Sequence, residues 1–298
     1  MSVWRAAAPG KVNLALFLGP AREDGYHEIV TLVQALTLAD ELVLEPAPEG
    51  ARADEVVCPG VAGDNLAALA LRLFREATGW EAPPVRLSID KRVPVAAGMG
   101  GGSSNAAAAL RLAAAAAGRP AGDGLIAELA PRVGADVAAL LEPGLVLAEG
   151  FGERVTPLEP LDPAPTFVVV PLPGAELSTP AVFAEADRLE LPRDAGELAQ
   201  ERAGLLPPGR LHNDLEPAAR SLCPAVAEAL HAFYLLPASP RDGLVSGSGP
   251  TVFGVWDDPA EAERSAAELA ERFPGTAIAE PAPHGMGAPE PVGTGGSA

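Results

Sequence analysis

Four glycines within the five residues 98–102 stand between a predicted strand and a long alanine-rich helix. Glycine loses more conformational freedom on folding than any other residue, so packing alone does not explain this density. The segment suits a backbone that turns with positive φ and approaches a ligand closely. Ser103-Ser104-Asn105 follow directly, where the helix starts. Free N–H groups and the positive dipole end at a helix N-terminus bind anions, so the sequence predicts a phosphate-binding loop.

Two common nucleotide motifs do not fit this loop. A P-loop has lysine directly after its last glycine, whereas Gly102 is followed by Ser103. The dinucleotide fingerprint G-x-G-x-x-G, counted from Gly98, has Ser103 at its third glycine position. A flexible linker is a poor interpretation as well, because linkers rarely lie between a regular strand and a long helix. The pattern indicates a glycine-rich nucleotide loop of another type.

The charge balance limits the partners of the chain. Its 298 residues include 21 Lys and Arg against 40 Asp and Glu, which gives a formal charge of −19. Clustered basic residues supply the affinity for phosphate backbones, so we expect no nucleic acid and no anionic membrane as partner. Bulk charge also repels phosphorylated ligands, so a site for them has to be locally positive. The chain has only two lysines, Lys11 and Lys91, and Lys91 lies just before the glycine segment.

Cysteine usage and the N-terminus indicate the compartment. Cys58 and Cys223 form no C-x-x-C pair, which argues against a disulfide scaffold and a cysteine zinc site. The first residues lack the apolar region of a secretory signal, and no apolar run approaches the roughly 18 residues of a transmembrane helix. We expect a cytoplasmic protein. The sequence identifies no metal-ligating residues.

Hydrophobic periodicity and a proline-rich segment divide the chain into two predicted domains of an α+β fold. Prolines around residue 160 mark the boundary, so we expect domains over 1–160 and 161–280. The second has the order strand, helices, strand, strand, helix, strand, which is typical of a ferredoxin-like sandwich. In the first, a helix begins after Asp64 or Asn65 and ends at Gly79. The Gly- and Pro-rich residues 281–298 are expected to be a disordered tail.

Residues 11–18 alternate as a strand does. The expected faces are Val12, Leu14, Leu16 and Leu18 on one side, and Lys11, Asn13, Ala15 and Phe17 on the other. Asn13 is therefore expected beside Lys11, as a hydrogen-bonding partner for a substrate.

The residues from Pro94 to Ala106 match the pattern Pro-x-x-x-Gly-[Leu/Met]-Gly-[Gly/Ser]-[Gly/Ser]-Ser-Ser-[Asn/Asp]-Ala, and the chain resembles the GHMP small-molecule kinases. Further stretches carry the resemblance in the right order: residues 8–14, 22–27, 134–137, 148–153, 178–183 and 246–249. The resemblance implies the two-domain GHMP kinase fold. An N-terminal mixed α/β nucleotide-binding domain and a C-terminal ferredoxin-like α/β sandwich would enclose the active site between them.

The resemblance also implies Lys11 and Asp136 as the catalytic pair of an ATP- and Mg²⁺-dependent kinase. Phosphoryl transfer depends on positioning and charge neutralisation. Asp136 would accept the proton of the attacking hydroxyl, and Lys11 would counter charge at the transferred phosphate. Nucleotide contacts are expected at Lys91, Pro94, Gly98, Met99, Gly100, Gly101, Gly102, Ser103, Ser104 and Asn105. Nucleotide phosphates, water and Ser103 or Ser104 would hold the metal ion.

For the acceptor, the resemblance implies a cytosine pocket at Tyr26, His27 and Phe183, with Asn13 nearby. Aromatic faces stack on a nucleobase, and a histidine reads its edge. The expected small-molecule substrate is a cytidine diphosphate-linked methylerythritol, phosphorylated at its 2-hydroxyl. Alternatives are a homoserine or mevalonate type of kinase, a decarboxylase relative, and a noncatalytic nucleotide-binding sensor. Retention of both Lys11 and Asp136 argues against the sensor.

Overall fold

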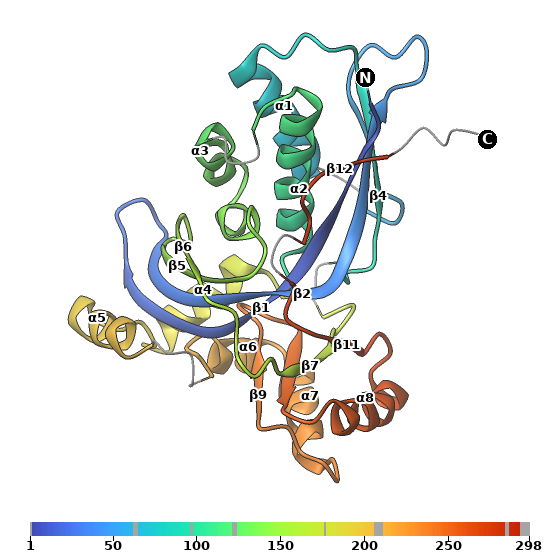
Figure 1. Cartoon of the computed structure of the whole chain (residues 1–298). Helices are drawn as coiled ribbons and strands as arrows, with labels where there is room; N and C mark the ends of the chain where they lie inside the picture. The colour runs from blue at the N-terminus through green and yellow to red at the C-terminus, as the bar shows by residue number, and fades with distance from the viewer. Residues whose placement is uncertain are drawn as a thin grey trace.

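The computed structural model describes residues 2–61, 65–95, 98–120, 124–175, 177–205, 211–283 and 286–292. Its strands form an eight-stranded and a four-stranded sheet, each covered by helices. Within the described part, no helix is long and apolar enough to cross a bilayer. The predicted α+β class and the two-domain fold are confirmed (Figure 1).

The larger sheet is built around a long, curved hairpin of β1 and β2 (Figure 1). Its hydrogen-bonded path is β12-β1-β2-β4-β3, with β5 between β2 and β6, and with β8 parallel to β1. The strands are β1 (Trp4–Ala21), β2 (His27–Pro46), β3 (Glu55–Val57), β4 (Val85–Asp90), β5 (Leu145–Gly150), β6 (Arg154–Leu158), β8 (His212–Asn213) and β12 (Glu290–Pro291).

Four helical segments pack with β1, β2 and β4 around one hydrophobic core. They are α1 (Leu66–Thr78), α2 (Gly101–Ala116), α3 (Gly124–Val133) and the 3₁₀ helix η1 (Ala135–Leu140). Asn65 caps α1 by accepting a hydrogen bond from the Ala67 amide, as one of the two predicted caps; Asp64 lies outside the described residues. Gly79 ends the helix with φ of 63°, as predicted.

The smaller sheet has the order β11-β7-β10-β9. Taken along the chain, these are its fourth, first, third and second strands, the order of the predicted ferredoxin-like sandwich. The strands are β7 (Thr166–Val170), β9 (Asp242–Val245), β10 (Val252–Trp256) and β11 (Ala277–Ala279). The helices of this half are α4 (Thr179–Arg188), α5 (Ala195–Gly204), α6 (Glu216–Leu222), α7 (Pro224–Leu235) and α8 (Pro259–Arg272).

The domain boundary near residue 160 stays a proposal. The chain leaves the larger sheet at Leu158 and enters the smaller one at Thr166. It also returns, because β8 pairs with Ala15 and Leu16 of β1. The second half of the chain therefore contributes a strand to the first sheet.

The C-terminal segment differs from the expected disordered tail. Ala282 donates its amide proton to Ala35, and Val292 donates to Val3. Between them, Glu290 pairs with Arg5 in the strand pairing of β12 with β1 (Figure 1). The sequence predicted disorder because this Gly- and Pro-rich segment has no hydrophobic periodicity. Backbone hydrogen bonds to an open strand edge need no hydrophobic pattern, so residues 281–283 and 286–292 are ordered along the sheet.

The predicted faces of residues 11–18 are wrong beyond Leu14. A register shift between Asn13 and Ala15 leaves one extra residue in β1, a β-bulge. Val12 and Leu14 pack in the same core as Ala15 and Phe17, whereas Leu16 and Leu18 pack in the core of the smaller sheet. The bulge reverses the alternation, so Leu16 follows Lys11 and Asn13 along the wall of one cavity.

Candidate active site

A cavity of about 800 Å³ lies where the larger sheet meets the second half of the chain. Strands β1 and β2, the glycine segment and η1 line it from one side, and α4 and the loop 246–249 from the other. The side chains or backbone of these predicted site residues line it: Lys11, Asn13, Tyr26, His27, Lys91, Pro94, Gly98, Met99, Gly100, Gly101, Gly102, Ser103, Asn105, Asp136 and Phe183. Ser104, which was also predicted to contact the nucleotide, is fully buried within α2 and does not line the cavity.

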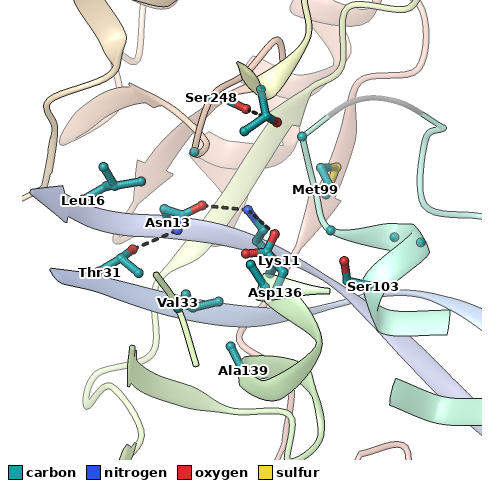
Figure 2. A pocket seen from close by; sticks show the side chains of 18 of the residues that line it. Lys11, Asn13, Leu16, Thr31, Val33, Met99, Ser103, Asp136, Ala139 and Ser248 are labelled. Carbon is teal, nitrogen blue, oxygen red and sulfur yellow. Dashed lines mark hydrogen bonds and ion pairs between the residues drawn. The ribbon is translucent and has the colours of Figure 1, made fainter. Parts of the chain in front are cut away.

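The predicted catalytic pair is close together in this cavity. Lys11 Nζ lies 3.6 Å from Asp136 Oδ2, and Figure 2 shows both side chains directed toward each other. The lysine is buried, while the carboxylate is half exposed to the cavity. The Lys11 amide donates to the carbonyl of Met99 at 2.9 Å, which joins β1 to the glycine segment.

Asn13 and Thr31 continue the polar row from Lys11. Lys11 Nζ donates to Asn13 Oδ1 at 2.8 Å, and Asn13 Nδ2 donates to Thr31 Oγ1 at 2.8 Å (Figure 2). The threonine is buried in β2, and sequence reasoning missed it. Period-2 alternation placed Asn13 correctly but says nothing about which residue of the neighbouring strand lies opposite.

Arg111 holds the element that carries Asp136. It lies in the alanine-rich helix α2 and is fully buried. Its Nη1 donates to the carbonyls of Leu140 and Leu141, at the end of η1, and its Nη2 donates to Ala7 of β1. Burial lowers the pKa of this guanidinium to about 10. One side chain thus connects the helix of the glycine segment, the 3₁₀ helix and the strand of Lys11.

The glycine segment forms the start of α2 earlier than predicted. Gly100, with φ of 65°, is the N-cap residue, and the helix begins at Gly101 rather than around Ser103. Because the first N–H groups of a helix have no intrahelical partner, the amides of residues 101–103 are donors for an anion. A Cβ on Gly100 would lie 3.0 Å from Lys11 Cγ, so glycine permits this close approach to Lys11.

Lys91 is held by a carboxylate that the sequence did not reveal. Its Nζ lies 2.5 Å from Oδ2 of Asp40, which is fully buried and also accepts the amides of Arg92 and Val93. A Cβ on Gly101 would lie 3.1 Å from Lys91 Nζ, so the ammonium group is next to the first turn of α2. The predicted positive charge beside the glycine segment is therefore present, as part of an ion pair.

Aromatic side chains gather at the other end of the cavity. The rings of His27 and Phe183 lie 5.4 Å apart, and those of Tyr26 and Phe151 also lie 5.4 Å apart. His27 Nε2 is 2.8 Å from Oδ1 of Asp187 on α4. Phe151 and Asp187 were missed as site residues. The segment 148–153 carries part of the family resemblance, but no local signal distinguishes Phe151 as a stacking ring from a core residue.

The loop 246–249 of the second half completes the cavity. A Cβ on Gly247, where φ is 58°, would lie 3.0 Å from Asn13 Oδ1 and 3.3 Å from Lys11 Nζ. Asn213 Nδ2 donates to the carbonyls of Val245 and Gly247 and fixes the loop there. The backbone of this loop therefore lies directly against Lys11 and Asn13.

The requirements of metal sites and of thiol nucleophiles also apply to this cavity. Among the described residues, no three His, Cys, Asp or Glu side chains form a cluster that could hold a metal ion by themselves. Cys58 lines the cavity, and burial raises the pKa of its thiol, so the thiolate form of a nucleophile is disfavoured. The arrangement instead offers anion donors, one lysine and one carboxylate, which suits phosphoryl transfer to a hydroxyl.

Comparison with known proteins agrees with this geometry. The model of the GHMP kinases N terminal domain matches residues 65–144, and that of the GHMP kinases C terminal matches residues 181–275. The 4-diphosphocytidyl-2-C-methyl-D-erythritol kinase of Leifsonia xyli subsp. xyli is 40% identical over 273 residues, with 85% of this chain and 87% of the relative covered. The enzyme of the same name from Paracoccus denitrificans is 38% identical, with 92% and 95% covered.

Solved structures give the same result. The crystal structure of 4-(cytidine 5'-diphospho)-2C-methyl-D-erythritol kinase is 34% identical, has a TM-score of 0.75, and covers 94% of this chain and 100% of its own. The homoserine kinase from Cytophaga hutchinsonii, at 17% identity and a TM-score of 0.72, shares the fold over 98% of each chain. The chain therefore belongs to the GHMP kinase family.

Proposed function

We propose that this chain transfers the γ-phosphoryl group of ATP to the 2-hydroxyl of 4-diphosphocytidyl-2-C-methyl-D-erythritol. One observation carries the proposal: a single cavity contains the Lys11–Asp136 pair at one end and an aromatic pocket at the other. A nucleobase stacks on aromatic faces, whereas homoserine and mevalonate have no base to place there. The relatives that are 36–40% identical over most of the chain carry the name of this kinase.

Asp136 and Lys11 have complementary roles in the proposed reaction. The carboxylate of Asp136 accepts the proton of the 2-hydroxyl, while the oxygen of this hydroxyl forms a bond to the γ-phosphorus of ATP. The bond from that phosphorus to the β–γ bridging oxygen breaks, and ADP leaves. Lys11, 3.6 Å from Asp136, counters the negative charge on the transferred phosphoryl group.

The remaining residues bind and orient the two substrates. The amides of residues 101–103 and Lys91 bind the nucleotide phosphates, which locally offsets the acidic charge of the chain. Tyr26, Phe151 and Phe183 enclose the cytosine, with His27 at its edge. Asn13 has one N–H and one oxygen lone pair left for the acceptor after its bonds to Lys11 and Thr31.

Mg²⁺ belongs to the proposal as the ion that neutralises the phosphate charge. We expect this ion to take most of its ligands from phosphates and water. Ser103, at the first turn of α2 beside the cavity, is the expected hydroxyl ligand. Both cysteines are free thiols, which suits the cytoplasm as the compartment of this non-mevalonate isoprenoid step.

Coupled ADP release tests the proposal directly. Purified protein is assayed with ATP and Mg²⁺ and with the cytidyl substrate, homoserine or mevalonate as acceptor. We expect turnover with the cytidyl substrate and a mass increase of one phosphoryl group on it. Turnover with mevalonate or homoserine alone would contradict the proposal, and ATP binding without turnover of any acceptor would favour a sensor.

A further inference from the structure

Three hydrogen bonds in sequence connect the catalytic lysine to the interior of the sheet. Lys11 Nζ donates to Asn13 Oδ1, Asn13 Nδ2 donates to Thr31 Oγ1, and Thr31 Oγ1 donates to the Ala15 carbonyl at 2.7 Å. The three side chains are buried. Figure 2 shows Thr31 on β2 beside Asn13, on the side away from Lys11.

Donor and acceptor chemistry allows this chain of bonds only one direction. An ammonium group only donates, so the oxygen of the Asn13 amide has to face Lys11. The amide nitrogen then faces Thr31, and the hydroxyl oxygen has to accept from it. Its own proton goes to the Ala15 carbonyl, which only accepts. Lys11 and Thr31 thus hold the Asn13 amide from its two ends, because the hydroxyl, whose proton goes to Ala15, can only accept from Nδ2.

The strand pairing explains why Thr31 lies at this place. Asn13 pairs with Val33 and Leu16 pairs with Thr31, with the bulge of β1 between the two pairs. The bulge brings Lys11, Asn13 and Leu16 to the cavity wall, where Thr31 and Val33 lie on the adjacent strand. Sheet geometry thus sets the threonine beside the amide without any contact to Lys11.

We propose that Thr31 is a positioning residue for the phosphoryl transfer. By orienting the Asn13 amide, it keeps Lys11 Nζ at 3.6 Å from Asp136 and leaves a defined N–H and lone pair of Asn13 for the acceptor. Without the hydroxyl, the buried Nδ2 group of Asn13 loses its acceptor, and only the bond from Lys11 still orients the amide. This inference rests on the proposed function, because it assigns Lys11 and Asn13 to that reaction.

The first test is a comparison of Thr31→Val with Thr31→Ser in steady-state kinetics. The substitution Thr31→Val leaves the buried Nδ2 group of Asn13 without its acceptor, so we expect kcat to fall about 5- to 100-fold, with KM for ATP within about twofold of wild type. Thr31→Ser keeps the hydroxyl and should recover most of kcat. Thr166→Val, a buried threonine of β7 away from the cavity, is the control and should keep wild-type kcat.

A double-mutant cycle tests whether Thr31 acts through Asn13. On an Asn13→Ala background, Thr31→Val should cost less than about twofold in kcat, because its target is gone. Full additivity of the two losses would overturn the proposal. Equal losses of kcat in Thr31→Val and Thr166→Val, each with a matching fall in Tm, would also overturn it and make Thr31 merely structural.

A spectroscopic readout separates this inference from the identity of the acceptor. Because the chain has two lysines, protein labelled with ¹³C at the lysine ε-carbon gives two NMR signals, and Lys91→Arg assigns them. We expect the Lys11 signal to move in Thr31→Val and to stay in Thr31→Ser, with the Lys91 signal as the internal reference. An unmoved Lys11 signal would overturn the inference. A wild-type protein that phosphorylates no acceptor would overturn only the proposed function.

Discussion

Gly98 and Gly249 are in contact across the junction of the two halves of the chain. A Cβ on Gly98 would lie 2.8 Å from the carbonyl carbon of Gly249 and closer still to its oxygen. Gly98 also has φ of 75°, which disfavours residues with a side chain. The glycine segment of one half and the loop 246–249 of the other therefore depend on each other's backbone.

We expect Gly98→Ala to weaken both the fold and ATP binding. The left-handed backbone alone costs roughly 1–2 kcal/mol, and the clash with Gly249 adds to it by separating the two loops. Gly118→Ala is the matched control, because Gly118 has φ of 70° with no atom near its Cβ position. Thermal unfolding and binding of a fluorescent ATP analogue measure the difference. Equal effects of the two substitutions would contradict the importance of the contact.

Asp136→Asn should remove most of the turnover while nucleotide binding is retained. The amide keeps the shape of the carboxylate but cannot accept the proton of the acceptor, and such proton transfer contributes about 10²- to 10⁴-fold. We expect kcat to fall by about this factor. The dissociation constant of ATP should change little, since the amides of α2 stay in place. Isothermal titration with a non-hydrolysable ATP analogue measures this dissociation constant. If Asp136→Asn keeps the wild-type kcat, the carboxylate is not the base.

Phe151→Ala should weaken binding of the acceptor rather than catalysis. Stacking of a base on an aromatic ring is worth about 1–3 kcal/mol, so KM for the cytidyl substrate should rise about 5- to 150-fold, with kcat and KM for ATP nearly unchanged. Tyr234→Ala serves as control, because this exposed aromatic side chain of α7 is outside the cavity. If Phe151→Ala leaves KM for the acceptor unchanged, Phe151 does not belong to the base pocket.

The stability of the junction should depend on pH through Asp214. Burial by itself raises the pKa of this carboxyl, but hydrogen bonds from His212, Arg193 and the Leu18 amide outweigh it, and the net pKa is below its ordinary value. A lowered folded pKa stabilises the protein above the unfolded pKa, and this contribution is lost as pH falls through the folded pKa. Asp214→Asn should therefore lower the urea midpoint at about pH 7 and have a shrinking effect toward about pH 2.

An exposed carboxylate provides the control for this measurement. Asp257 pairs with Arg241 at the surface, and such pairs contribute little. Asp257→Asn should leave the midpoint almost unchanged at either pH. A constant difference between wild type and Asp214→Asn over the whole range would show that the carboxylate does not titrate with folding.

Local signals in the sequence predicted the elements with strong periodicity and the residues in motifs. Asn65 and Gly79 have the chemistry of helix caps, and they cap the first and the last turn of α1 as expected. Lys11 and Asp136, 125 residues apart along the chain, were paired by a resemblance between motifs and not by any local pattern. The structure brings them to 3.6 Å, and their catalytic roles stay a prediction that kinetics has to test.

What the sequence did not reveal depends on pairing between distant strands. The bulge after Asn13 is visible only in the register of β1 against β2, and it decides the faces of Leu16 and Leu18. Thr31 and Asp40 gain their importance from neighbours 18 and 51 residues away. Period-2 alternation gives the direction of a side chain in an ideal strand but neither its cross-strand partner nor an inserted residue.

The pairing of β12 with β1 has a consequence for the order of folding during synthesis. Trp4 and Arg5 leave the ribosome 287 and 285 residues ahead of their partners Pro291 and Glu290. Until then this end of β1 presents unpaired backbone groups, which other nascent chains can bind. The larger sheet is therefore completed only after translation of the second half. A chain truncated before residue 281 should aggregate more readily, while Lys11 and Asp136 remain close to each other.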